Sequence, residues 1–282
     1  MSRAIPLALA AIVLWGFLAL LSSRLSGLEP LLMAGVALSI GGMLGLVKVR
    51  QWKVPLRTFG VGLAGIFGYH FLLFTAFHAA PTVEANLINY LWPLLIVLLS
   101  PVVMSGYGLR PRHIVGALAG LAGAALIVTG GSFRLDAANL PGYLAAAGAA
   151  LVWALYSLLT KRLPRFESGA VGGFCLCSGA LALAAYVLQR GLSGFTVIHG
   201  ADWIFLVLLG TGPMGAAFYL WDAALKRGDP RVIGSLSYLT PLLSTLALVL
   251  IAGKPLTALS ALAMALIIAG AVIGSLPGRS PA

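Results

Sequence analysis

The sequence predicts an all-α membrane protein, with ten transmembrane helices in two inverted five-helix repeats around a central cavity. Composition is the first reason: of the 282 residues, 60% are hydrophobic and 9% are charged, whereas a soluble domain carries about 25% charged residues. The mean hydropathy is +1.03. The apolar residues also fall into ten runs of membrane-spanning length, and one short motif occurs in both halves of the chain.

Each run holds about 20 mostly apolar residues, which is the length that an α-helix needs to cross the hydrocarbon core. The expected limits are 4–22, 31–47, 58–79, 82–104, 113–131, 141–160, 169–189, 201–221, 231–252 and 256–276. The first run follows Arg3 and is longer than the apolar core of a signal peptide, which is ~7–15 residues. Because nine more runs follow, we interpret it as a retained first helix.

The basic residues between the runs indicate which ends of the spans face the cytoplasm. If the N-terminus is cytoplasmic, the cytoplasmic segments hold 14 of the 18 Lys and Arg residues, and the other four are Arg24, Arg134, Arg190 and Lys254. The positive-inside rule therefore predicts that both termini are cytoplasmic. We interpret the formal net charge of +11 as a topology signal and not as nucleic-acid binding. The segment 48–57 is in addition a candidate contact for anionic lipid.

Nothing in the sequence predicts an enzyme, a metal site or a cofactor. Cys175 and Cys177 lie two residues apart in an apolar run, where they would not share a helix face, so we interpret both as packing residues. The sequence also contains no clustered His and carboxylate motif and no phosphate-binding glycine loop.

One motif occurs in both halves: residues 89–95 read NYLWPLL and residues 237–243 read SYLTPLL. A second pair of stretches is also alike, VLWGFLALLSSRL at 13–25 and LVWALYSLLTKRL at 151–163. Each half therefore holds five spans, and we divide the chain into repeats at 1–135 and 136–282. Five is an odd number, so the second copy enters the bilayer from the opposite side, as in many secondary transporters.

The repeated prolines predict helix breaks at one depth. Pro93 lies 11 residues into the fourth span and Pro241 ten residues into the ninth, which places both ~15 Å deep, near the bilayer midplane. Gly212 and Pro213 interrupt the eighth span in the same way. We therefore predict helix breaks or hinges at Pro93, Pro241, Gly212 and Pro213, where freed backbone groups line protein or a water-filled cavity.

Polar and aromatic residues midway along the spans are the candidate substrate-binding residues. Asn86 and Tyr90 share a helix face with Asn89 and Pro93, by their spacing of three, four and seven residues. Packing within the bundle is the alternative interpretation for each hydroxyl, amide and ring. The predicted substrate-binding residues are His70, Asn86, Tyr90, Trp92, Trp153, Ser235 and Tyr238.

The kind of substrate follows from the charges that this region lacks. None of the basic residues lies midway along a span, where a carrier of phosphorylated metabolites would need them. No carboxylate lies there either, since Glu84 and Asp222 are near span ends. Aromatic and neutral polar residues suit a neutral or zwitterionic molecule with an apolar side chain, such as an amino acid. The sequence thus predicts a transporter with an alternating-access site.

The ten spans, the two halves and the repeated tyrosine–leucine–x–proline motif resemble the drug/metabolite transporter superfamily, of the EamA type. EANLI before NYLWPLL, together with His70, is similar to its aromatic amino acid exporters. The resemblance implies a bundle in which the first and sixth spans rock. It also implies amino acid export across the inner membrane of a Gram-negative bacterium, with Tyr90, Trp92, His70, Trp153 and Tyr238 lining the site.

The mode of transport and the oligomeric state are also expectations. The first span lacks the glutamate that small members of the superfamily use, which favours facilitated diffusion. The small-residue motifs GALAG (116–120) and GAVIG (270–274) are expected to pack within one chain, which predicts a monomer. Three alternatives stay open: a multidrug or purine-type metabolite exporter, a passive channel and a membrane receptor.

Overall fold

The structure is a computed structural model that describes residues 3–252 and 257–276. Lys254, Arg279 and the first residue of the predicted tenth span lie outside the described residues. Every regular element in the described part is helical, and ten of its helices are long and apolar enough to cross a bilayer. The predicted fold class, an all-α membrane protein with ten spans, is confirmed.

The spans of the first half are built from several helical segments. They comprise α1 (Ala4–Gly16) and α2 (Leu18–Ser23), α3 (Pro30–Met43) and η1 (Leu44–Trp52), α4 (Leu56–Leu63), η2 (Ala64–Gly68) and α5 (Tyr69–Ala79), α6 (Thr82–Asn89) and α7 (Trp92–Val103), and α8 (Pro111–Thr129). Only the fifth span is one uninterrupted helix.

The second half follows the same order of segments. It comprises η3 (Ala137–Asn139) and α9 (Leu140–Arg162), η4 (Ser168–Ala170) and α10 (Val171–Arg190), the connecting η5 (Ser193–Val197), α11 (Gly200–Thr211), η6 (Gly212–Ala216) and α12 (Ala217–Arg227), α13 (Pro230–Leu236) and α14 (Leu239–Ala252), and α15 (Ala258–Ser275). The predicted limits agree with these bounds to within about four residues, except in the second and eighth spans.

The eighth span continues to Arg227, six residues beyond its predicted end at 221. The predicted span ended directly before Asp222, a charged residue of the kind that usually lies at the end of an apolar run. In the structure Lys226 donates to Asp222 across 2.6 Å, one helical turn away. Because this pairing offsets both charges locally, the helix continues past them.

The two halves repeat the same irregularities at the same spacing. The π turns η2 and η6 each contain five residues, and Ala64 and Gly212 begin them 148 residues apart, the separation of Tyr90 from Tyr238. The helices α6 and α13, which precede the repeated prolines, begin at the same spacing. The repeat seen in the sequence is therefore matched by a repeat of local backbone structure.

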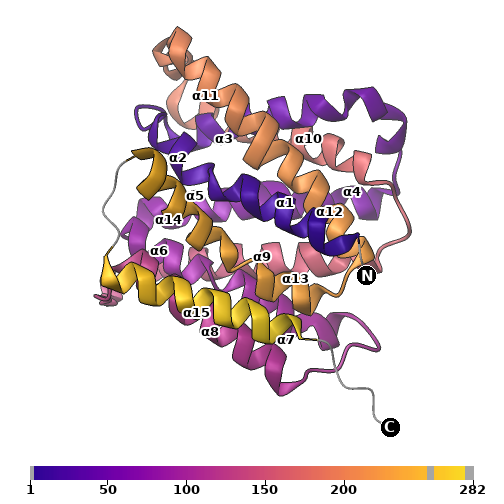
Figure 1. Cartoon of the computed structure of the whole chain (residues 1–282). Coiled ribbons are helices and arrows are strands. Elements are labelled where there is room, and N and C mark those ends of the chain that lie inside the picture. The colour runs from indigo at the N-terminus through magenta and orange to yellow at the C-terminus, as the bar shows by residue number, and fades with distance from the viewer. Residues whose placement is uncertain (1–2, 253–256, 277–282) are drawn as a thin grey trace.

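Packing between the halves also occurs in matched pairs. The second span packs on the seventh through α3 and α10, and the fifth packs on the tenth through α8 and α15. The first helix α1 packs on α12, and its counterpart α9 packs on α5. Figure 1 shows α3 with α10 at one edge of the bundle and α8 with α15 at the opposite edge. The first helix of each half thus packs on a helix of the other half, as expected for two halves related by a two-fold axis.

In the same view α1 begins and α15 ends at one end of the bundle, on the right of Figure 1. The loops at this end carry most of the described Lys and Arg residues. We call it the basic end. The other end carries Arg24, Arg134 and Arg190.

Glycine allows α8 and α15 to approach closely. A Cβ at Gly270 would lie 2.6 Å from the carbonyl oxygen of Gly116, and a Cβ at Gly116 would lie 2.6 Å from the backbone nitrogen of Gly274. A side chain on either helix would therefore collide with backbone, which cannot move aside as a flexible side chain can. The GALAG and GAVIG motifs pack against each other within the chain, as predicted.

Replacement of Gly270 by Ala should destabilise the protein. The forced separation of α8 and α15 should cost roughly 1–3 kcal/mol, more than the gain of about 1 kcal/mol in helix propensity. We expect a melting temperature several degrees lower for the detergent-solubilised variant. Gly60→Ala is the matched control, because its Cβ would meet no atom within 4 Å. Equal melting temperatures for the two variants would contradict the proposed close packing.

Candidate functional site

The fourth span is interrupted at the repeated proline. α6 ends at Asn89 and α7 begins at Trp92, so Pro93 lies in the first turn of α7. Proline has no N–H to donate and its fixed φ suits a helix start, which explains why the helix restarts here. The carbonyl oxygen of Tyr90, inside the break, accepts a hydrogen bond from the Tyr238 hydroxyl at 3.2 Å. The backbone carbonyl that the break leaves without a helical partner in the first half thus accepts from the equivalent tyrosine of the second half.

The ninth span is interrupted at the equivalent place. α13 ends at Leu236 and α14 begins at Leu239, with Pro241 in the first turn of α14. Within the break the Ser237 hydroxyl donates to the carbonyl oxygen of Ile233 at 2.8 Å. Both breaks lie just before the proline, at the end of the preceding helix.

The third and eighth spans contain π turns instead of breaks. A π turn shifts the hydrogen-bond register and leaves backbone groups without their usual partners. In the eighth span the turn begins at Gly212, and the carbonyl oxygen of Pro213 accepts a hydrogen bond from the indole Nε1 of Trp15 at 3.0 Å. The first span is therefore tied to the irregular part of the eighth span.

Four tryptophan rings meet in the centre of the bundle. Trp15, Trp92, Trp153 and Trp221 are buried, and their ring centroids lie between 5.1 and 6.4 Å apart in five of the pairs. Four of these pairs are edge-to-face, an arrangement that contributes about 0.5–1.5 kcal/mol per pair beyond burial. The rings come from α1, α7, α9 and α12, so four spans from both halves converge on one point. We call this group the tryptophan cluster.

His70 lies beside the tryptophan cluster. Its ring is 5.0 Å from that of Tyr69 and 6.1 Å from that of Phe218, and Tyr69 in turn is 5.2 Å from Trp153. The His70 Nδ1 atom is 2.7 Å from the carbonyl oxygen of Ile66. Because a carbonyl can only accept, Nδ1 carries the hydrogen and Nε2 is left as an acceptor.

The other predicted substrate-binding residues do not gather in one place. Asn86 is half-buried on α6, and Tyr90 lies in the break between α6 and α7. Tyr238 is fully buried, and a Cβ at Gly120 of α8 would contact its ring at 2.4 Å. Ser235 packs against Gly274 of α15, and its hydroxyl donates to the carbonyl oxygen of Arg231 at 3.0 Å. The structure thus brings Trp92, Trp153 and His70 together and places Ser235 beside the outer helix pair.

Sequence reasoning missed Trp221 and Phe218 as members of this region. Both are buried in α12, and Trp221 lies closest to Trp15, with ring centroids 5.1 Å apart. The predicted eighth span ended at 221, so Trp221 resembled an ordinary interfacial tryptophan. Recognising the Asp222–Lys226 pair within the helix would have lengthened the span and placed this ring nearer its middle.

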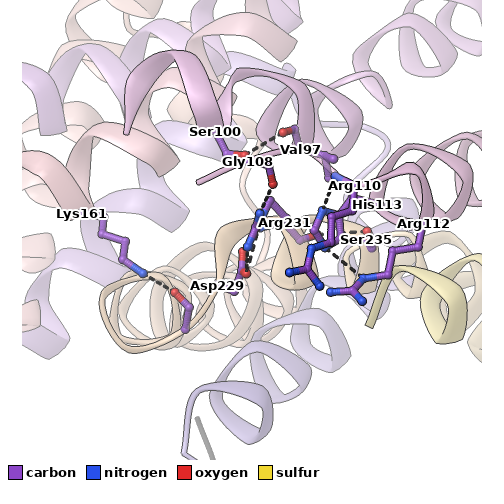
Figure 2. Close-up of polar contacts among 11 residues, drawn as sticks. Val97, Ser100, Gly108, Arg110, Arg112, His113, Lys161, Asp229, Arg231 and Ser235 are labelled. Atoms are coloured by element: carbon purple, nitrogen blue, oxygen red, sulfur yellow. Dashed lines mark hydrogen bonds and ion pairs between the residues drawn. The ribbon is translucent and has the colours of Figure 1, made fainter. Parts of the chain in front are cut away.

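A polar cluster lies at the basic end between α7, α8 and α13 (Figure 2). The Arg231 guanidinium donates to the Asp229 carboxylate, with Nε 2.9 Å from Oδ1, and to the carbonyl oxygen of Gly108. It also lies over the Tyr107 ring, 5.1 Å from the centroid. Because Gly108 and Tyr107 belong to the loop between α7 and α8, Arg231 connects the two halves. We call these four residues the Arg231 latch.

Asp229 stays charged in this latch. Burial by itself would raise the pKa of its carboxyl group, but hydrogen bonds from the Arg231 side chain and backbone outweigh it and hold the pKa below its ordinary value. A carboxylate with a lowered pKa contributes stability above its unfolded-state pKa and loses it only as the pH falls through the lowered folded-state pKa. The latch therefore persists at neutral and mildly acidic pH.

Within the described residues no three His, Cys, Asp or Glu side chains gather in a group that could hold a metal ion. Cys175 and Cys177 are free thiols.

Comparison with known proteins places this geometry among transporters. The family model described as the EamA-like transporter family matches residues 2–129 and 140–276. The aromatic amino acid exporter YddG of Ancylobacter novellus is 41% identical over 99% of each chain. The protein of the same name from Salmonella typhimurium is 26% identical over 90% of each chain. A crystal structure with 41% sequence identity matches 97% of this chain and 96% of its own, with a TM-score of 0.91.

Replacing Tyr238 with Phe should destabilise the fold while preserving its shape. The variant leaves the Tyr90 carbonyl without its donor, at a cost of about 1–3 kcal/mol in the free energy of unfolding. Tyr186→Phe is the control, because Tyr186 is buried in α10 and its hydroxyl makes no hydrogen bond within the described residues. Chemical denaturation in detergent measures both. Similar free energies of unfolding for the two variants would show that the Tyr238 hydroxyl does not satisfy the break.

Proposed function

Because the chain belongs to the EamA-like transporter family, we propose that it exports amino acids, aromatic ones among them, from the cytoplasm of a Gram-negative bacterium. The observation that carries this proposal is the tryptophan cluster, which is aromatic and uncharged and adjoins the break between α6 and α7 and the π turn of the eighth span. Two relatives bear the name of aromatic amino acid exporter, in agreement with it. The protein is a multi-pass membrane protein. The charge bias of its loops supports an inner-membrane location with both termini cytoplasmic.

An amino acid would be recognised by two kinds of contact. Its side chain would stack on Trp92 and Trp153, and its ammonium and carboxylate groups would meet neutral polar groups, among them Asn86, Tyr90 and the free Nε2 of His70. In the described conformation the tryptophan rings contact one another, so binding requires them to separate. Ser235 and Tyr238 lie further from the cluster, and their role in binding stays a prediction.

We further propose that access alternates between the two sides through movement of α1 and α9. These helices carry Trp15 and Trp153 and pack against the interrupted spans of the opposite half. Residues 1–135 and 136–282 would be the two inverted repeats, with hinges at Pro93, Pro241, Gly212 and Pro213. The Arg231 latch would be the gate on the cytoplasmic side. Because α8 and α15 use their glycine faces within the chain, a monomer is the proposed functional unit.

Transport would be facilitated diffusion without proton coupling. Asp222 is buried in the eighth span, but it already has Lys226 as its partner at 2.6 Å. An acid neutralised by its own helix is less suited to carry a proton across the membrane than an unpaired one. We therefore expect a pH gradient to leave the transport rate unchanged.

Two alternatives make different use of the same bundle. A multidrug or purine-type exporter would also employ an aromatic centre, but it would not need groups for both an ammonium and a carboxylate. A passive channel would need a continuous water-filled path, whereas four tryptophan rings meet in the centre here.

Liposomes that contain the purified protein should take up phenylalanine and threonine. Unlabelled substrate inside should accelerate uptake of labelled substrate outside, because a carrier returns faster when loaded. A channel would show no such acceleration, and its absence would contradict the proposed mechanism. In Trp92→Ala we expect a loss of phenylalanine uptake of roughly 2- to 10-fold, from the lost stacking energy, with a smaller loss for threonine.

Trp203→Ala is the matched control for this variant. Trp203 is 47% exposed on α11, away from the tryptophan cluster, so the control should transport both amino acids at the normal rate. An equal loss for phenylalanine and threonine in Trp92→Ala would exclude a stacking role for Trp92.

Weakening the Arg231 latch should open the cytoplasmic side. In a Cys175→Ala, Cys177→Ala background, a cysteine at the buried Val97 position of α7 serves as the reporter. We expect Arg231→Gln to increase its labelling by a maleimide from the cytoplasmic side several-fold. Arg227→Gln is the control, because among the described residues the Arg227 side chain donates to Ala223 of its own helix and to no residue of another element. Unchanged labelling in Arg231→Gln, or an equal increase in Arg227→Gln, would rule out the latch as a gate.

A further inference from the structure

Two cavities at the basic end of α9 are both lined by Arg162. One has a volume of about 270 Å³, and Arg57 lies on its other wall. The second has a volume of about 470 Å³ and is lined by Lys161, Tyr107 and the last turn of α7. The two cavities share Arg162, and Arg57 and Lys161 add one further cation to each. We treat them together as one candidate groove. We call it the Arg162 groove.

The cations of the Arg162 groove have no carboxylate partner among the described residues. Lys161 donates to the carbonyl oxygen of Gly228, and Arg162 donates to that of Val103 at 3.0 Å. An ammonium group has three donors and a guanidinium group has five, so most of these donors remain available. The hydrogen bonds of these cations go to neutral backbone carbonyls, so their positive charges are not offset within the described residues. Such a group of cations is suited to bind an anion from outside the chain.

Apolar side chains form part of the lining of both cavities, among them Leu163 in the smaller and Val102 in the larger. Val102 of α7, which lines the larger cavity together with Lys161 and Arg162, is 76% exposed. In a membrane-spanning bundle such side chains contact acyl chains. Lys161 lies over the ring of Tyr107, 5.2 Å from the centroid, and tyrosine is typical of the boundary between hydrocarbon and headgroups. The cations thus lie where headgroup phosphates lie, and the apolar wall lies where acyl chains lie.

We propose that the Arg162 groove binds the headgroup phosphate of an anionic phospholipid from the leaflet on the basic side. Basic pockets between transmembrane helices on this side bind such headgroups in other proteins. A soluble phosphate would use the cations but not the apolar wall, which is why a lipid fits better than a free anion. The bound lipid would bridge α9 to α4 and α7. This inference does not depend on the identity of the transported substrate.

The test compares lipids on the delipidated full-length protein. Native mass spectrometry measures retained lipid, and thermal unfolding measures the shift in melting temperature, with dioleoyl phosphatidylglycerol, dioleoyl phosphatidylcholine and soluble glycerol 3-phosphate as probes. We expect phosphatidylglycerol alone to be retained and to raise the melting temperature. Arg57→Gln with Arg162→Gln should weaken its binding roughly 25-fold, about five-fold for each charge removed. Arg57→Lys with Arg162→Lys should preserve most of it.

Arg24→Gln with Arg134→Gln is the matched control, since it removes two charges at the opposite end of the bundle. Equal retention of phosphatidylglycerol by the two Gln variants, or equal retention of phosphatidylcholine by the unmodified protein, would overturn the proposal. A comparable shift with glycerol 3-phosphate would show a free-anion site and would overturn it as well. If the double Gln variant does not fold, Arg57→Gln carries the test, because the Arg57 side chain has no hydrogen bond within the described residues. It should bind about five-fold more weakly.

Discussion

The structure depends on one constraint: a backbone carbonyl inside a bilayer needs a donor from the protein, because no water is available. The repeated proline and the π turn each free such a carbonyl midway along a span. Aromatic side chains from the opposite half supply the donors, Tyr238 to Tyr90 and Trp15 to Pro213. Because the donors belong to large rings, the contacts that satisfy the backbone also bring aromatic surface into the centre of the bundle.

This arrangement separates the centre of the molecule from its ends. The centre is held by ring contacts and neutral hydrogen bonds, whereas charged contacts gather at the two ends. Arg231 pairs with Asp229 at the basic end, and Arg190 pairs with Glu29, 3.1 Å apart, at the other. An alternating-access carrier needs ends that open in turn around a fixed middle. The contact between Arg190 and Glu29 is exposed enough for water to compete with it.

The sequence was sufficient to predict the ten spans, because each rests on a local pattern. The inverted repeat and the hinges at the prolines stay predictions. Apolar runs have a required length, and the two copies of the motif carry the same proline. The sequence was less informative about which side chains meet. Asn86 and Ser235 have similar polarity and depth, but only the packing of α13 against α15 turns Ser235 toward Gly274. Trp221 was missed because the charged pair that follows it is compensated within one helix, which no apolar pattern reveals.

The pairing of α3 with α10 and of α8 with α15 determines how the chain can be assembled. Synthesis proceeds from the N-terminus, so the glycine-lined face of α8 enters the bilayer long before α15 exists to cover it. Until then the face lacks the helix that covers it in the complete bundle. Packing of α8 is therefore incomplete until α15 has been synthesised, and a ribosome that stops before Ala258 leaves the glycine-lined face of α8 without its partner helix.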